Sequence, residues 1–82
     1  MAAKRALYGF TVKAAAMFAD TLRVNAVAPG PVLAPEGVRE KAGDTPLGRP
    51  TVEAVAEAVA FLLDAESTTG CTIPVDGGQH LS

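Results

Sequence analysis

The chain has 82 residues, of which 49% are hydrophobic and 20% charged, a composition typical of one soluble globular domain or part of one. Its net charge of −2 argues against a nucleic-acid partner, because phosphate binding needs clustered lysines and arginines. The single cysteine, Cys71, supplies neither an internal disulfide nor a metal cluster. We therefore expect no metal site and a reducing, cytoplasmic location.

Residues 1–19 form the first expected element, a helix. Apolar side chains recur at helical spacing and predict one buried face: Leu7, Phe10, Ala14, Met17 and Phe18. Lys4 and Arg5 stand at the positive end of the helix dipole, where a cation is unfavourable. Because functional sites are where local rules tend to be broken, Lys4 is a candidate functional residue. Thr11 and Lys13 interrupt the apolar run, so we expect neither a targeting segment nor a membrane partner.

Residues 22–35 (LRVNAVAPGPVLAP) are the stretch around which the other elements are organised. Small and β-branched residues alternate from Leu22 to Ala28 and predict a strand. Pro29 and Pro31 remove backbone donors, and Gly30 can take conformations closed to other residues, so a stiff bend ends the strand. In open α/β sheets ligands bind beyond the carboxyl ends of the strands, where such a bend can present its backbone to a flat ligand. The simpler interpretation is a strand followed by a proline-rich turn.

The second half of the chain predicts a helix between two less regular segments. Residues 36–50 are polar and rich in glycine and proline, which favours a mobile segment or a short helix. Thr51 is expected to cap a helix with this apolar stripe: Val52, Val55, Ala56, Val59, Leu62 and Leu63. Residues 71–75 read as a short strand, which Pro74 places at a sheet edge. Strand, helix and strand predict a parallel βαβ unit, which needs further cover from the chain or from a partner.

Four segments carry a resemblance to a known family. They are residues 3–11 (AKRALYGFT), 23–30 (RVNAVAPG), 46–50 (PLGRP) and 70–78 (GCTIPVDGG). In this order and spacing they resemble the C-terminal part of the classical short-chain dehydrogenase/reductases, over essentially the whole chain. The resemblance implies that residues 1–82 are a single partial domain, the C-terminal part of an α/β, doubly wound parallel-sheet (Rossmann-like) fold. The family's glycine-rich phosphate loop is expected upstream, since no G-x-G-x-x-G spacing occurs here.

The resemblance also implies roles for individual residues. Lys4 would be the catalytic lysine, which binds the ribose hydroxyls of a nicotinamide cofactor and favours the phenolate of a tyrosine one helical turn earlier. That tyrosine would fall one place ahead of Met1. The remaining implied contacts are to the cofactor from Pro29, Gly30 and Val32, and to the substrate from Pro31 and Leu33. We interpret Tyr8 as an ordinary helix residue, and His80 as a surface residue with no acid adjacent to it.

The implied function is that of an NAD(P)-dependent oxidoreductase, which transfers hydride between nicotinamide and a carbonyl, alcohol or pterin-type small-molecule substrate. The residues most resemble bacterial pteridine-reductase-like members, which favours NADP over NAD; 3-oxoacyl carrier-protein reductases and sugar or alcohol dehydrogenases stay open as alternatives. Family members are commonly homo-oligomers, and we expect the 82-residue fragment to be inactive alone. The alternatives are a non-catalytic remnant that acts as an oligomerisation or interaction module, and an unfolded product.

Overall fold

The computed structural model describes residues 2–32 and 45–81, and the predictions for residues 33–44 lie outside these ranges. Five elements follow in chain order: α1 (Ala2–Met17), β1 (Ala26–Pro29), α2 (Val52–Asp64), β2 (Thr72–Val75) and the short 3₁₀ helix η1 (Gln79–Leu81). The predicted order of helix, strand, helix and strand is therefore confirmed, and the fold class is α/β. Neither α1 nor α2 is long and apolar enough to cross a membrane.

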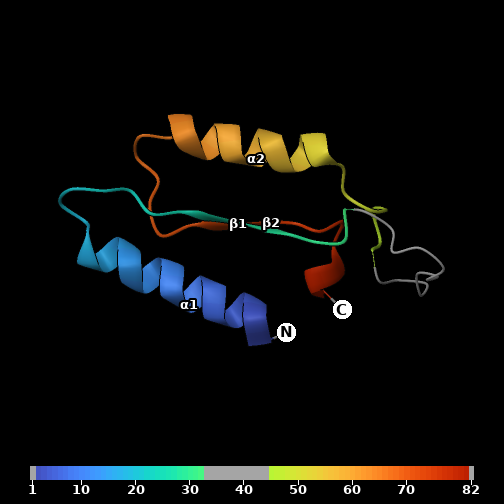
Figure 1. Cartoon of the computed structure of the whole chain (residues 1–82), viewed down its shortest axis with the longest axis horizontal. Coiled ribbons are helices and arrows are strands. Elements are labelled where there is room, and N and C mark those ends of the chain that lie inside the picture. The colour runs from blue at the N-terminus through green and yellow to red at the C-terminus, as the bar shows by residue number, and fades with distance from the viewer. Residues whose placement is uncertain (1, 33–44, 82) are drawn as a thin grey trace.

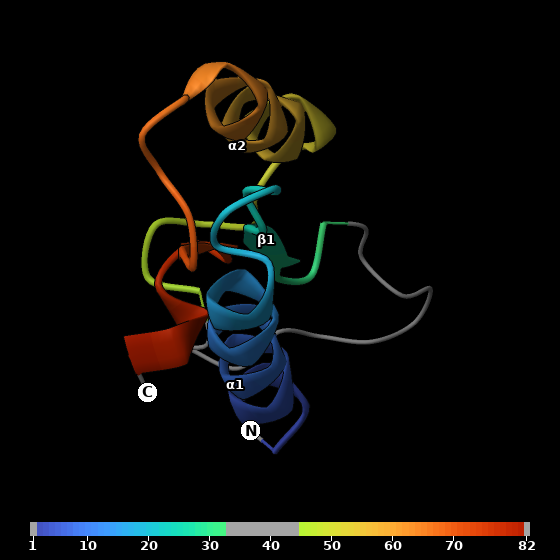
Figure 2. The same cartoon turned by 90° about the vertical axis from the view of Figure 1, so that its left-hand side faces the viewer.

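The two strands form a parallel pair between two helical layers. Ala26 lies opposite Thr72 and Pro29 opposite Val75. Helix α1 covers one face of the pair and α2 the other (Figures 1 and 2). Both strands run toward the end of the molecule where α1 begins and where η1 lies (Figure 1). The carboxyl edge of the sheet therefore brings together segments from both ends of the sequence.

β1 begins later than the alternation of residues predicts, because the preceding residues bind the chain that enters β2. The Val24 amide donates to Thr69 Oγ1 (3.0 Å), and its carbonyl accepts from the Gly70 amide (2.8 Å). Asn25 donates through Nδ2 to the Thr68 carbonyl (2.8 Å) and accepts at Oδ1 from the Cys71 amide (3.0 Å). These contacts align the two entry segments and so fix the register of the strands.

Helix α1 packs only part of the predicted apolar face: Leu7 and Ala14 are half-buried. Three residues of the predicted apolar face are largely exposed: Phe10 (70%), Met17 (72%) and Phe18 (44%). The buried positions are Thr11 and Ala15, and the Thr11 hydroxyl is satisfied by the Leu7 carbonyl (2.7 Å). Ala15 packs against the segment that leads into β2, since a Cβ added at Gly70 would lie 3.5 Å from Ala15 Cβ, an ordinary contact distance. The prediction of the apolar face is therefore right for Leu7 and Ala14 and wrong for Phe10, Met17 and Phe18.

Helix α2 has a side-chain cap at each end. Thr51 accepts at Oγ1 from the Ala54 amide (3.0 Å), which confirms the predicted N-cap. At the other end the helix has no basic residue in its last turn, and Arg23 supplies the cation from the segment before β1. Its guanidinium donates to three carbonyl oxygens at 2.8–3.1 Å: Leu62, Leu63 and Ala65. Arg23 therefore ties the end of α2 to the start of the sheet.

Candidate functional site

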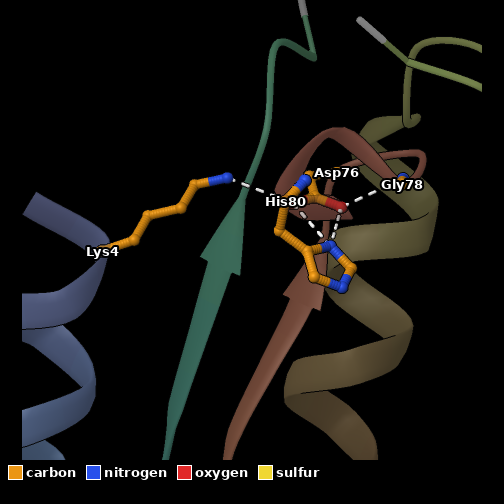
Figure 3. A network of polar contacts seen from close by, with 4 residues as sticks. All are labelled: Lys4, Asp76, Gly78 and His80. Carbon is orange, nitrogen blue, oxygen red and sulfur yellow. Dashed lines mark hydrogen bonds and ion pairs between the residues drawn. The ribbon is translucent and has the colours of Figure 1, made fainter. Parts of the chain in front are cut away.

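The Lys4 side chain extends from the first turns of α1 to the carboxyl end of the sheet (Figure 3). Its Nζ donates to Oδ2 of Asp76 at 3.0 Å. Asp76 directly follows β2 and is 2% exposed, whereas the lysine side chain is 26% exposed. An anionic partner at the start of a helix offsets the unfavourable position of the lysine in the helix dipole, since α1 has no acidic residue in its first turn.

The Asp76 carboxylate is held by its own turn as well as by Lys4. Oδ1 accepts from the Gly78 amide (3.1 Å), and Oδ2 accepts from the His80 amide (3.0 Å). The His80 ring lies over the same carboxylate, with Nδ1 2.9 Å from Oδ1 and 3.1 Å from Oδ2 (Figure 3). Because a carboxylate only accepts, Nδ1 is the ring nitrogen that carries the hydrogen. Gly77 and Gly78 have positive φ (64° and 91°), which lets the turn fold back onto Asp76.

These contacts keep Asp76 ionised despite its burial. Burial raises the pKa of the Asp76 carboxyl, but the hydrogen bonds from His80, Lys4 and the Gly78 amide lower it more. The pKa consequently falls from 3.8 to about 2. At neutral pH the site therefore holds a buried carboxylate between a lysine and a histidine.

The bend after β1 packs directly on this carboxylate residue. The Gly30 amide donates to the Val75 carbonyl (2.9 Å), which extends the strand pairing by one residue. A Cβ added at Gly30 would lie 2.6 Å from Asp76 Cβ and 2.7 Å from Asp76 Cα, distances that no side chain tolerates. The positive-φ glycines of the described chain do not include Gly30. Glycine is therefore needed here for space against Asp76, and not for the unusual conformation that the sequence predicts.

A third segment, residues 45–50, joins the bend to the turn after β2. Arg49 donates through Nη1 to the Pro31 carbonyl (2.9 Å), and the Leu47 amide donates to the Gly77 carbonyl (2.8 Å). An open cleft of about 520 Å³ runs along this segment, between the start of α2, the end of β2 and η1. The bend is thus held from two sides, by Asp76 and by Arg49.

The structure brings some of the predicted site residues together and leaves others apart. Lys4 lies at the same edge of the sheet as Pro29 and Gly30, and half-buried Pro31 and Val32 continue the bend. Leu33 lies outside the described residues.

Two residues of the site were misjudged or missed in the sequence. His80 is exposed, as expected of a surface residue, but the expectation that no acid lies beside it is wrong, because its ring binds Asp76. Asp76 itself was missed as a site residue. The available signal was an aspartate at a strand end, followed by two glycines and by a histidine four positions later. Nothing local in that pattern points to Lys4, which lies 72 positions away.

Comparison with known proteins places this arrangement in context. The family model described as enoyl-(acyl carrier protein) reductase matches residues 1–80. The uncharacterized oxidoreductase YhdF of Bacillus subtilis is 40% identical over 96% of this chain, which spans 32% of that protein. The 3-oxoacyl-(acyl-carrier-protein) reductase FabG of Pseudomonas aeruginosa is 41% identical over 99% of this chain and 37% of its own length. The chain therefore spans about a third of the length of the curated relatives it matches.

A solved structure shows the same arrangement of elements. The FolM alternative dihydrofolate reductase 1 of Brucella suis, crystallised in complex with NADP, superposes with a TM-score of 0.79 and 38% sequence identity. The match covers 96% of this chain and 32% of the FolM chain. The helix–strand–helix–strand unit described above is therefore part of a larger fold in that protein.

Proposed function

This chain belongs to the short-chain dehydrogenase/reductase family, and from that premise we propose that it forms the nicotinamide-binding, C-terminal part of an NAD(P)-dependent oxidoreductase. In this proposal residues 1–82 are a partial domain, and the dinucleotide-binding half comes from sequence beyond it. NADP is the preferred cofactor, in keeping with the FolM structure that contains it. A cytoplasmic location and assembly into homo-oligomers stay predictions.

The observation that carries the proposal is that Asp76 contacts both Lys4 and the bend after β1. Lys4 reaches the carboxyl edge of the sheet, where ligands of open α/β folds bind, and its ammonium lies on the residue against which Gly30 packs. An ammonium group has three N–H donors, and Asp76 accepts one of them. The ammonium is thus suited to hold vicinal hydroxyls such as those of a ribose.

The residues of the bend have complementary roles in this proposal. A bound nicotinamide supplies the hydride donor or acceptor, which no side chain of the protein provides. Pro29, Gly30 and Val32 hold the flat ring through backbone groups, while Pro31 and Leu33 face the substrate. The residues fit such a ring because Arg49 and Asp76 hold the backbone of the bend from both sides, so little ordering is required when a ligand binds.

The proposed substrate is a small molecule with a carbonyl, alcohol or pterin-type group. The names of two relatives support the reacting groups: FabG is a 3-oxoacyl-(acyl-carrier-protein) reductase, and FolM is an alternative dihydrofolate reductase. These relatives do not favour the alternative function as a non-catalytic interaction module. We propose that the chain, as part of the larger domain, supplies the lysine and the nicotinamide bend, and that it is inactive by itself.

A chimera tests the proposal. The first two-thirds of the Brucella suis FolM protein are joined to this chain, which replaces the matching third. We expect the chimera to bind NADPH, measured by fluorescence of the reduced nicotinamide, and to oxidise it with dihydrofolate or a 3-oxoacyl thioester. Lys4→Met removes the positive charge that favours the phenolate of the neighbouring tyrosine. If this raises the pKa of that tyrosine by one unit or more, turnover should fall at least about tenfold, because 1.4 kcal/mol is a factor of ten in rate.

The matched control is Lys13→Met, an exposed lysine on the same helix, which should leave turnover unchanged. A folded chimera that binds no NADPH would refute the proposed function. Equal turnover in Lys4→Met and the parent chimera would refute the role of Lys4.

A further inference from the structure

Lys4 is a flexible side chain whose anchor is rigid. The Asp76 carboxylate receives two backbone hydrogen bonds from its own turn, from Gly78 and His80, so its place does not depend on Lys4. The lysine side chain has four rotatable bonds and is 26% exposed, so without a partner it would sample many rotamers. The position of the Lys4 ammonium therefore depends on Asp76, whereas the position of Asp76 does not depend on Lys4.

Asp76 also fixes the distance between Lys4 and the bend. Its Cα and Cβ are the atoms that Gly30 packs against, and its Oδ2 holds the ammonium. One residue thus touches both parts of the site, from the end of β2. A change in its side chain would move the ammonium relative to the bend without altering either of them directly.

His80 gives the carboxylate a second side-chain hydrogen-bond partner. Its Nδ1 lies 2.9 Å from Oδ1, on the turn side of the carboxylate, whereas Lys4 approaches from α1 (Figure 3). A buried carboxylate that loses its only partner is left uncompensated at a cost of several kcal/mol. The ring and the two backbone amides hold Asp76 in place while Lys4 donates its remaining N–H groups to a ligand.

We propose that Asp76 is the positioning residue that holds the Lys4 ammonium beside the bend through one N–H, which leaves the other two N–H groups for a ligand's hydroxyls, and that His80 helps to hold the carboxylate in place. The inference rests on the proposed function for the identity of that ligand. Asp76 need not touch the cofactor, because it acts through Lys4.

The holding role is tested in the 82-residue chain without any cofactor, by ¹³C NMR. We expect Lys4 Cε to relax as an ordered group, in contrast to the exposed Lys13 Cε in the same sample. Asp76→Asn should make Lys4 Cε as mobile as Lys13, while the fold, followed by backbone chemical shifts, persists. His80→Gln should leave Lys4 ordered, because Oδ2 still accepts from it. A Lys4 that is as mobile as Lys13 in the parent chain, or equally ordered in Asp76→Asn, overturns the inference.

The coupling to the ligand is tested in the FolM chimera by a double-mutant cycle on the Kd for NADPH. Asp76→Asn should weaken binding about tenfold in the parent, and should have no further effect in the Lys4→Met background, because the two changes remove one function. Additive effects of the two changes would mean that Asp76 acts independently of Lys4, and would overturn the inference. Absence of NADPH binding in the parent chimera would instead refute the proposed function, and the NMR result would still decide the holding role.

Discussion

At the scale of single residues, Asp76 and Gly30 show how closely the two strand ends approach. Gly30 is not one of the positive-φ glycines, and its missing side chain is what lets the bend lie on Asp76. Sequence alone could place a glycine between two prolines, but it could not say which neighbour required it. The same holds for His80, whose partner is defined by a turn that only the two positive-φ glycines permit.

Gly30→Ala should therefore destabilise the chain, whereas another glycine-to-alanine change should not. The new Cβ would lie 2.6 Å from Cβ and 2.7 Å from Cα of Asp76, and these atoms cannot move without shifting the backbone. We therefore expect the free energy of unfolding to fall by about 1–3 kcal/mol. Gly9→Ala is the control, because nothing lies within 4 Å of its added Cβ and alanine favours a helix by ~0.5–1 kcal/mol. Urea unfolding followed by circular dichroism measures both; a loss at Gly9 as large as at Gly30 would contradict the explanation.

At the scale of the elements, local sequence patterns predicted the helices and strands better than they predicted how these elements pack together. The helix over 52–64 and its Thr51 cap follow from residues within one helical turn of each other, and both are confirmed. The packed face of α1 followed only in part, because small residues such as Thr11 and Ala15 are buried while Phe10 and Met17 are exposed. The late start of β1 likewise depends on Asn25 and its partners some 45 positions later, which no periodicity reveals.

Arg23 offers a test of how the elements hold one another. Arg23→Met removes three hydrogen bonds to the last carbonyls of α2 and the favourable charge at that end, so we expect a loss of about 1–2 kcal/mol. Hydrogen exchange should quicken first in the last turn of α2. Arg23→Lys should recover only part of the loss, because an ammonium lacks the planar fork.

The control for this change is Arg5→Met, an exposed arginine on α1, which should alter stability by less than ~0.5 kcal/mol. If Arg23→Met and Arg5→Met cost the same, Arg23 does not cap the helix.

At the scale of the whole molecule, the layered arrangement could be predicted from the sequence. How much apolar side-chain surface stays exposed on the helices could not. Two parallel strands between two helices follow from the chain order, as the sequence indicated. Large apolar side chains nevertheless remain exposed on both helices: Tyr8, Phe10 and Met17 on α1, and Val52, Phe61 and Leu63 on α2. Such surface is what a larger domain or a further copy of the chain would cover.

The free energy of unfolding of the whole chain should depend on acid through Asp76. The pKa of this group is about 2 in the folded chain against 3.8 ordinarily, so protons bind the unfolded state more tightly. The stabilisation, about 2 kcal/mol, is fully present above pH ~4 and is lost as the pH falls through about 2. Asp76→Asn should make the urea unfolding midpoint less dependent on pH between pH ~5 and ~2. The control, Asp20→Asn at an exposed position, should leave that pH dependence as in the parent chain. The same pH dependence in both variants would contradict the assignment to Asp76.

The partnership between Lys4 and Asp76 also has a consequence for how the chain acquires its shape. The two residues are separated by 72 positions, and closing a loop of that length costs on the order of 4 kcal/mol in chain entropy. Such a contact forms late, after the local helices, and parallel strand pairing is slow for the same reason. During synthesis on the ribosome, α1 emerges long before the turn that holds its lysine. The ammonium lacks its partner until the turn after β2 has formed, so the carboxyl edge of the sheet is completed only when that turn meets the start of α1.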